Sequence, residues 1–449
     1  MLNKPLKIGV GAGFADDRIA PAVELAESGE IDYLVFECLA ERTTARENLS
    51  RQKDPRLGYS PRLAERMTAV LPGCRQYGTR IVTNMGAANP LAGARLVRKV
   101  ARELGLGDVP CAAVEGDDVS AAILEMPGLP LLENGEPLES ISTRMVSANA
   151  YLGADVVRDA LRTGAEVVIT GRVSDPSLFL APAMHHFGWN CDDLDKLAAG
   201  SLAGHLLECG VQVSGGCFAD PGRKSVTDLA RVGAPIGEIL ADGSVTITKL
   251  EGSGGRVDVA TCSEQLIYEV HNPAEYITPD CVLDLTEVTL EETSPNRVLA
   301  RGARARPRTP TYKVTVGYFD GYIGVGEVSY AGINAVARAK LAAEVVQERL
   351  RLLGYRYSEI RVDLIGMSSL HGMEAGRPEP YEVRLRIAAR TEDRTAAHAV
   401  GVETRALHVS GPAGGGGGAD PVVRQVLAVA SVLVPRGIVK PRITVERND

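Results

Sequence analysis

The stretch E-V-V-I-T-G-R-V-S-D-P-S, from Glu166 to Ser177, decides the fold class of this 449-residue chain. Its first half carries an uninterrupted β-branched run at 167–169, which is typical of a strand buried on both faces. Its second half breaks into a turn-rich loop that carries Arg172 and Asp175. In an open parallel sheet, the loops at the carboxyl ends of strands converge on the ligand site. The stretch therefore predicts a parallel α/β sheet with an enzyme-like site at its edge.

Outward from this stretch, the first 190 residues repeat strand, loop and helix. Strands are expected at L-K-I-G-V-G, I-D-Y-L-V-F, T-R-I-V-T and V-P-C-A-A-V, and helices at 20–28, 90–104 and 154–163. This alternation predicts βαβ units and a mostly parallel sheet in the N-terminal half.

After about Gly216 the pattern changes to short strand-like runs, among them R-V-D-V-A-T at 256–261. A helix is expected at 335–354, strands at 359–365 and 382–389, and a buried helix around the apolar run V-L-A-V-A-S-V-L-V at 426–434. We therefore predict an α/β domain at 1–250 that carries the site and an α+β region at 251–449.

Composition narrows the classes of function. A hydrophobic content of 45% with 24% charged residues is typical of a soluble globular protein. The net charge of −8 and an aromatic content of 4% argue against nucleic-acid or membrane partners and favour a small-molecule substrate. No signal peptide or transmembrane span is visible, and the eight cysteines form no C-x-x-C pair. We therefore expect a cytoplasmic protein with free thiols.

The segment G-V-G-A-G-F at 9–14 suggests a dinucleotide-binding turn, but Phe14 stands where the G-x-G-x-x-G pattern has its third glycine. Asp16 and Asp17 follow, and their charges would repel a pyrophosphate at a helix start. We expect no nicotinamide or flavin cofactor here. The alternative is a tight turn at the ligand edge of the sheet, where Asp17 and Arg18 pair or face the substrate.

His205, Glu208 and Cys209 have the i, i+3, i+4 spacing that places three side chains on one helical face. This face suits an acid/base pair, two or three metal ligands, or a buried hydrogen-bonded histidine. No second ligand pair stands at matching spacing, so we predict no metal site, and a divalent metal stays an alternative.

Arg172 and Asp175 suit a carboxylate clamp and a proton-handling group, or else a structural ion pair. The substrate-binding candidates stand beside expected strand ends or in the segment A-T-C-S-E-Q-L-I-Y-E-V: Asp17, Asn84, Asn89, Asn149, Tyr151, Glu264 and Gln265. Alternatively, these residues have only structural roles, in turns, at helix caps or on a solvent-exposed helix. The glycine run at 414–418 is either a phosphate cradle or an open loop.

Several segments together resemble the acyclic terpene utilisation (AtuA-like) family. The resemblance rests on I-G-V-G-A-G-F-A-D-D-R, D-Y-L-V-F-E-C-L-A-E-R-T, A-N-A-Y-L-G-A-D, V-V-I-T-G-R-V-S-D-P, F-G-W, G-H-L-L-E-C-G, S-G-G, A-T-C-S-E-Q-L-I-Y-E-V and P-T-Y-K-V-T-V-G-Y, within residues 6–330. Cys38 departs from the aspartate of the family pattern, so no carboxylate role carries over to it. The resemblance implies terpene catabolism, by chemistry similar to that of lyases acting on branched 3-hydroxyacyl or glutaryl thioesters.

We predict a lyase or hydro-lyase acting on a hydroxylated, carboxylate-bearing catabolic intermediate, free or as an acyl-CoA thioester. His205 or Glu208 would be the acid/base, Arg172 the anion clamp and Asp175 the second proton-handling group. This chemistry needs no redox cofactor, and coenzyme A enters only as part of the substrate. We expect a homo-oligomer. The alternatives are a non-catalytic partner of an acyl-CoA carboxylase or of a small companion protein, and a metal-dependent hydrolase built on His205 and Cys209.

Overall fold

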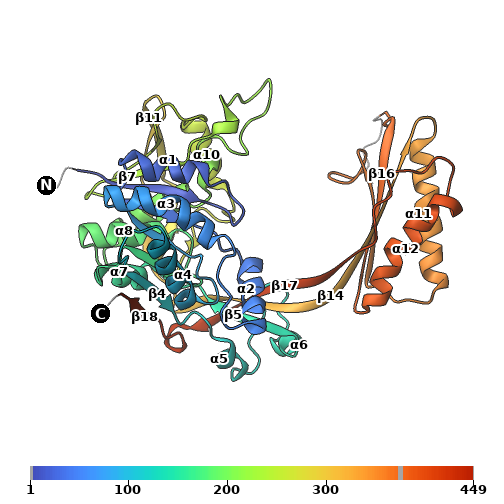
Figure 1. The fold of residues 1–449 in the computed structure, drawn as a ribbon, viewed down its shortest axis with the longest axis horizontal. Helices are drawn as coiled ribbons and strands as arrows, with labels where there is room; N and C mark the ends of the chain where they lie inside the picture. Colours follow the sequence, from blue (N-terminus) through green and yellow to red (C-terminus); the bar gives the residue numbers. More distant parts are fainter. Residues whose placement is uncertain (1–3, 373–377, 448–449) are drawn as a thin grey trace. The chain divides into compact units, whose positions relative to one another are not determined.

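In the computed structural model, residues 4–372 and 378–447 are described, and the chain divides into two compact units. Unit 1 comprises Met1–Gly317 and Val429–Asp449, and unit 2 comprises Tyr318–Ala428. Strands β14 (Thr311–Ala331) and β17 (Val422–Pro435) contribute residues to both units (Figure 1). The division predicted at residue 250 does not coincide with this boundary, because strands beyond it join the main sheet of unit 1.

The main sheet of unit 1 has ten strands in the order β11-β12-β8-β7-β1-β2-β3-β6-β4-β18. Its five central strands are parallel: β1 (Leu6–Ala12), β2 (Tyr33–Phe36), β3 (Arg80–Thr83), β6 (Val167–Thr170) and β4 (Cys111–Glu115). Val168 of β6 lies between Val82 of β3 and Ala112 of β4 and is fully buried. The β-branched run at 167–169 therefore forms the buried strand that the sequence predicts.

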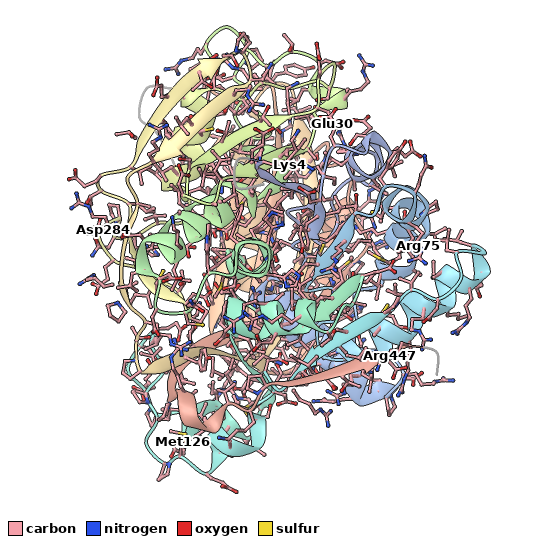
Figure 2. The ribbon with its side chains drawn as sticks, turned by 90° about the vertical axis from the view of Figure 1, so that its left-hand side faces the viewer. Lys4, Glu30, Arg75, Met126, Asp284 and Arg447 are labelled. Carbon is pink, nitrogen blue, oxygen red and sulfur yellow. The ribbon has the colours of Figure 1, made fainter. Side chains whose placement is uncertain are left out.

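The flanks of this sheet are antiparallel: β7 (Pro235–Ile239), β8 (Val245–Lys249), β12 (Arg297–Arg301) and β11 (Thr289–Ser294) beyond β1, and β18 (Arg442–Glu446) beside β4 (Figure 2). The prediction of a mostly parallel sheet is wrong, because the sheet is mixed. The link from β7 to β8 shows why: Leu240 N donates to Ser244 O at 2.9 Å. So short a connection has no room for a crossover helix and forces antiparallel pairing.

Helices cover both faces of the main sheet. Helices α1 (Ala20–Ser28), α3 (Leu63–Tyr77) and α4 (Pro90–Glu103) share one apolar core with the central strands. Helices α7 (Ala154–Arg162), α8 (Ser177–Phe187) and α9 (Leu194–Leu207) pack in sequence on one another, with α8 against β1 and β2. Proline at the first position of α4, behind the cap residue Asn89, starts that helix as expected.

The remaining elements of unit 1 surround this sandwich. They are α2 (Glu41–Lys53), α5 (Ser120–Leu124), α6 (Glu139–Ser142), β5 (Met145–Ala150), α10 (Val259–Ile267), β9 (Tyr276–Ile277), β10 (Cys281–Asp284) and β13 (Arg304–Pro307). The run R-V-D-V-A-T, expected as a strand, instead starts α10. Asp258 caps this helix through a capping box with Thr261, so a local hydrogen-bond motif overrides the β-branched composition.

Unit 2 is a sheet covered by two helices. Its strand order is β15 (Glu359–Ile365), β16 (Glu382–Thr391), β14, β17. Helices α11 (Ala335–Leu352) and α12 (Arg394–Ser410) pack on β16 (Figure 1). The strands predicted at 359–365 and 382–389 are confirmed. The glycine run forms a loop held to β14, since Gly416 and Ser329 exchange backbone hydrogen bonds of 2.8 and 3.0 Å.

The apolar run at 426–434, predicted as a helix, lies within strand β17. Its valines lose side-chain freedom in a helix and pack well on a pleated surface. Ala430, Val432 and Val434 alternate as buried positions along the strand. Within residues 4–372 and 378–447, no helix has the length and apolar character needed to traverse a bilayer.

Candidate active site

Polar side chains that follow the central parallel strands meet at one edge of the main sheet. Glu37 follows β2 directly and Asn84 follows β3, while Asp117 and Arg172 come one residue later after β4 and β6. The Asn84 Nδ2 atom donates to Glu37 Oε1 at 2.9 Å, and the Arg172 backbone N donates to Asp117 Oδ2 at 2.9 Å. Leu39 joins these two pairs, because its backbone N donates to Glu37 and its carbonyl oxygen accepts from Arg172, so the strand ends form one hydrogen-bonded cluster.

A cavity of about 480 Å³ opens beside these strand ends. We call it the acidic cavity, because six lining residues are carboxylic acids: Asp17, Glu37, Glu41, Asp175, Glu208 and Glu269. A second cavity of about 290 Å³, the side cavity, shares Glu41, Asp175 and Glu269 with it. The two cavities therefore adjoin at these three carboxyl groups.

Glu37 is a site residue that our sequence analysis missed. Burial, reinforced by the charge of Asp175, raises its pKa to about 8, although Arg172 opposes the shift. Its Oε1 atom accepts hydrogen bonds from Leu39 N at 2.8 Å and from Asn84 Nδ2. The side chain is thus a positioned acid that stays protonated at neutral pH. The signal was available, because Glu37 follows a strand end just as Asn84 does.

Arg172 and Asp175 form the ion pair at the end of β6, in contact through Nη2 and Oδ1. Arg172 is 1% exposed, and its other donors go to the carbonyl oxygens of Val173 and Leu39. It lines neither cavity. Every donor is directed at the protein itself, so this geometry gives no support to the predicted anion clamp. Asp175, 36% exposed, lines both cavities.

His205 and Glu208 form a second pair, with 3.0 Å between Nδ1 and Oε1. The His205 Nε2 atom lies 3.0 Å from the carbonyl of Leu266, which only accepts, so Nε2 carries a proton. One further proton is then shared between Nδ1 and the carboxyl. Burial, with the nearby charges of Asp175 and Glu269, raises the pKa of Glu208 to about 7 despite His205. Its buried Oε2 atom has no partner among the described protein groups.

Tyr151 links the arginine to the wall of the side cavity. Its ring lies 4.5 Å from the Arg172 guanidinium, and its hydroxyl donates to Glu41 Oε1 at 2.5 Å. Burial opposes ionisation of Glu41, but this hydrogen bond and the charges of Lys313 and Arg172 lower its pKa to about 2. Glu41 is therefore a fixed negative charge where the two cavities meet.

The other predicted substrate-binding residues divide into two groups. Asp17 lines the acidic cavity and accepts from Gly13 N at 3.2 Å. The remaining candidates do not line the acidic cavity. Asn84 is buried and orients Glu37, Asn149 in β5 donates to Asp117, and Asn89 caps α4. Glu264 pairs with Lys224, and Gln265 donates to the carbonyl of His205. Glu264 and Gln265 line a small cavity of about 150 Å³ that shares Gln212, Cys217 and Tyr268 with the acidic cavity.

The loop after β1 is closed by a close backbone approach. A Cβ atom on Gly13 would lie 2.2 Å from the carbonyl carbon of Cys209, so only glycine fits there. The segment that carries Cys209 therefore occupies the space beside this loop in which the backbone amides of a dinucleotide-binding turn would contact the cofactor. Nearby, the fully buried Arg66 donates to the Cys38 thiol at 2.7 Å and to the Phe14 and Asp17 carbonyls, which anchors this loop.

The metal alternative finds no support in the described part of the chain. Both ring nitrogens of His205 are engaged, as stated above. Burial raises the pKa of the Cys209 thiol to about 12, which disfavours the thiolate that a metal needs. Across residues 4–372 and 378–447, no three histidine, cysteine, aspartate or glutamate side chains are grouped as metal ligands.

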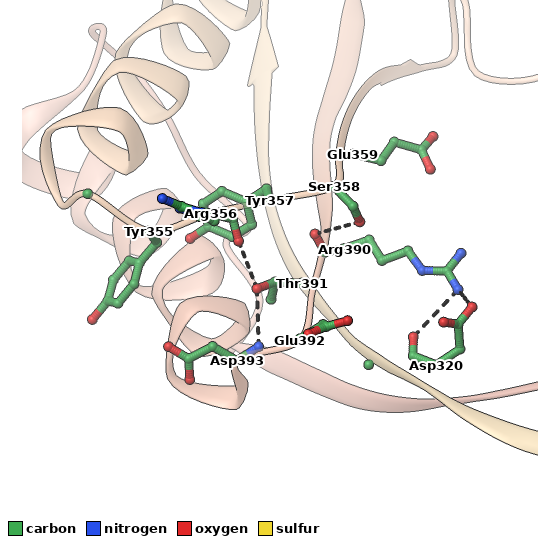
Figure 3. A pocket seen from close by; sticks show the side chains of 12 residues that line it. Asp320, Tyr355, Arg356, Tyr357, Ser358, Glu359, Arg390, Thr391, Glu392 and Asp393 are labelled. Atoms are coloured by element: carbon green, nitrogen blue, oxygen red, sulfur yellow. Dashed lines mark hydrogen bonds and ion pairs between the residues drawn. The ribbon is translucent and has the colours of Figure 1, made fainter. Parts of the chain in front are cut away.

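Unit 2 carries an open depression of about 870 Å³, formed by Asp320, Gly321 and the segments 354–359 and 390–393 (Figure 3). Arg390 pairs with Asp320 there, and Thr391 bridges Arg356 O and Asp393 N. It shares no lining residue with the acidic or side cavity. Five of its ten side chains are exposed, and none of the predicted site residues lies in it.

A comparison of the sequence with known protein families shows to which family the chain belongs. The model of the acyclic terpene utilisation family protein AtuA matches residues 6–445. The chain belongs to this family. The predicted resemblance is thereby confirmed and extends through the C-terminal region. Searches of curated proteins and of solved structures found no match. AtuA membership indicates a role in acyclic terpene catabolism and leaves the reaction to be argued from the site.

Proposed function

We propose that this AtuA protein is a lyase or hydro-lyase acting on a hydroxylated intermediate of terpene or branched-acid catabolism. The observation that carries the proposal is the acidic cavity with its two buried carboxyl groups of matched acidity. The pKa of Glu208 is raised to about 7 and that of Glu37 to about 8. General acids and bases work best when their pKa values lie near the working pH.

In a dehydration, ionised Glu208 removes a proton from the carbon next to a carbonyl through its unpartnered Oε2 atom. The electrons of the broken C–H bond form the carbon–carbon double bond. Protonated Glu37 donates its proton to the departing hydroxyl, which leaves as water. His205 stabilises ionised Glu208 through Nδ1, and the charge of Asp175 raises the pKa of both carboxyl groups.

Cleavage of a carbon–carbon bond would use the same groups in other roles. Glu208 would remove the proton of the substrate hydroxyl, and Glu37 would protonate the carbanion that departs. In either reaction the acidic cavity repels a free carboxylate at the reacting centre, because four further carboxylic acids line it. We therefore propose an acyl thioester, whose carbonyl is uncharged, as the reacting form of the carboxylate-bearing substrate.

Proton abstraction can be measured apart from complete turnover. We expect wild-type protein in D₂O to incorporate deuterium next to the carbonyl of a 3-hydroxyacyl pantetheine thioester, followed by NMR. Glu208→Gln is expected to slow this exchange about 10²-fold or more. Glu37→Gln is expected to slow dehydration by a similar factor and to leave the exchange largely intact. The matched control is Glu392→Gln in the exposed depression of unit 2. If both site variants keep wild-type rates, the assignment is wrong.

A second candidate function is docking on an acyl-CoA carboxylase or on a small companion protein. Four large apolar side chains of unit 2 favour it, since each is at least 80% exposed: Ile333, Leu370, Tyr381 and Val409. Size-exclusion of the protein mixed with its genomic neighbours tests this role. Co-elution that Tyr381→Ser and Val409→Ser abolish would support it, and separate elution would exclude it.

A further inference from the structure

We propose that the side cavity binds the hydrocarbon chain of the substrate, while the acidic cavity binds its hydroxylated head, and that Ile277 and Leu433 limit the chain length. This inference rests on the proposed function for the identity of the head group. It assigns a separate binding role to the side cavity, which takes no part in the proton transfers described above.

Much of the side-cavity wall is apolar, although the charged residues Glu41, Asp175, Glu269 and Lys313 also line it. Its lining includes three tyrosines, two prolines and two aliphatic residues: Tyr151, Tyr276, Tyr312, Pro176, Pro279, Ile277 and Leu433. Burial raises the pKa of each of the three phenols, so the rings stay neutral. A cavity that is mostly apolar and carries few oriented polar groups is typical of a binding site for a small organic ligand.

Several polar groups in this wall are already hydrogen-bonded within the protein. The hydroxyl of Thr278 donates to Cys281 O at 2.8 Å, and that of Thr309 donates to Thr311 O at 3.1 Å. The Tyr151 hydroxyl is held by Glu41. None of the described lining residues contributes a buried side-chain nitrogen or oxygen that lacks a partner. A ligand here gains by covering carbon surface and has little to gain from its own polar groups.

The acidic cavity has the opposite character. Two of its lining residues, Glu208 and Gln212, present buried side-chain oxygens without a protein partner. Such oxygens call for a donor from the ligand or from water. The two cavities meet at Glu41, Asp175 and Glu269, so a single ligand with a hydroxylated head and an apolar chain satisfies both.

Two side chains of the side-cavity wall remain partly open to solvent. Ile277 on β9 is 58% exposed and Leu433 on β17 is 43% exposed. A larger side chain at either position can be added from the solvent side and would shorten the space available to a chain. Ile267, 70% exposed on α10, lines neither cavity and provides the matched control for an added aromatic ring.

The test measures binding without turnover, by calorimetry on Glu208→Gln protein with 3-hydroxyacyl pantetheine thioesters of four, six and eight carbons. We expect affinity to rise about fourfold for each methylene that is buried. Adding Ile277→Trp is expected to weaken the eight-carbon ligand at least tenfold and to leave the four-carbon ligand within twofold. Ile267→Trp is expected to change neither. Leu433→Trp, on a different strand, repeats the test in case Ile277→Trp fails to fold.

Equal affinity for all three chain lengths, or equal behaviour of the Ile277→Trp and Ile267→Trp proteins, would overturn the assignment. Because no chemistry is measured, the outcome is distinct from that of the proposed function. Chain-length dependence together with no proton exchange in wild-type protein would retain the binding site and reject the lyase. Proton exchange without chain-length dependence would retain the lyase and reject the side cavity as the binding site of the chain.

Discussion

The acidic cavity of unit 1 and the open depression of unit 2 are both lined by several carboxylic acids, yet they differ in how far these groups are exposed to solvent. The depression is the larger, at about 870 Å³ against about 480 Å³. Three of its four carboxylic acids, Glu359, Glu392 and Asp393, are exposed (Figure 3). In the acidic cavity, burial raises the pKa values of Glu37 and Glu208 toward neutrality. We therefore base the proposed reactive site on the burial of its carboxyl groups and not on cavity size.

The arginines of the ion pairs in the two regions show the same contrast, whereas Asp175 is itself 36% exposed. Arg172 is 1% exposed and holds Asp175 within a closed set of hydrogen bonds. Arg390 is 36% exposed, and its partner Asp320 is 27% exposed. A buried charge that loses its partner is left uncompensated, whereas an exposed charge is screened by water. The Arg172 and Arg390 ion pairs are thus expected to contribute very different amounts to the free energy of unfolding.

The largest expected effect comes from Arg172→Met, which removes the buried cation and leaves Asp175 and the Leu39 carbonyl without their donor. We expect unit 1 to lose about 3–5 kcal/mol of stability, the usual cost of breaking a buried pair. The buried Trp189, the only tryptophan, lies in unit 1 and reports its urea unfolding by fluorescence. Arg390→Met is the control, with no shift in this signal. Equal effects of the two substitutions would remove the distinction between the regions.

The next effect is a pH dependence of stability from Glu37. A glutamate ordinarily ionises near pH 4.5, whereas Glu37 in the folded protein holds its proton up to about pH 8. Between these values the folded state binds one more proton than the unfolded state, so stability falls as pH rises. Glu37→Gln removes this loss. From pH 5 to pH 8 we expect the variant to gain more than about 1.4 kcal/mol on wild type, the equivalent of one pKa unit.

Urea unfolding at both pH values, followed at Trp189, checks this expectation. Glu359→Gln in the depression is the matched control and should follow wild type at both. A Glu37→Gln protein whose difference from wild type is the same at pH 5 and pH 8 would show that this carboxyl is not perturbed by folding.

The strands that build the site were predictable from sequence because each carries its own signal. The strand at 167–169 depends on the packing of β-branched side chains, and the helix start depends on Pro90 at the first helical position. Both are local features of the sequence. The antiparallel flanks were not predictable, because their pairing is fixed by contacts between distant segments, such as β18 beside β4. The same holds for β17, where tertiary pairing overrides a run that also suits a helix.

For the site, sequence located the ligand edge but not the role of each residue. Asn84 and Arg172 stand at strand ends as predicted, yet both are buried and act on neighbours. Whether such a residue faces a cavity depends on which backbone carbonyls approach it, as the carbonyls of Leu39 and Val173 approach Arg172. Glu37 was open to the same strand-end argument. Its raised pKa was not, because that depends on burial and on Asp175.

A smaller effect is expected from Tyr151→Phe, which removes the hydrogen bond to Glu41 where the two cavities meet. We expect a loss of about 1 kcal/mol at pH 7, below the ~1.5–3 kcal/mol typical of a bond to a charged group, because Glu41 is 38% exposed and partly screened by water. The pKa of Glu41 is lowered to about 2, so this stabilisation is present above about pH 4.5 and is lost as pH falls toward 2. The variant and wild type should therefore converge in acid. A difference that persists at pH 3 unchanged would assign the effect to packing.

The smallest effect is expected in unit 2, at the exposed ion pair of Arg390 and Asp320. A double-mutant cycle of Arg390→Ala and Asp320→Ala measures the coupling free energy of the exposed pair. We expect about 0.2–1 kcal/mol by calorimetric unfolding of the whole chain, because both side chains stay partly hydrated. Added salt should reduce it further, since solvent-exposed charges are screened. A coupling above about 3 kcal/mol would place this pair with Arg172 and Asp175, and burial would no longer separate the two regions.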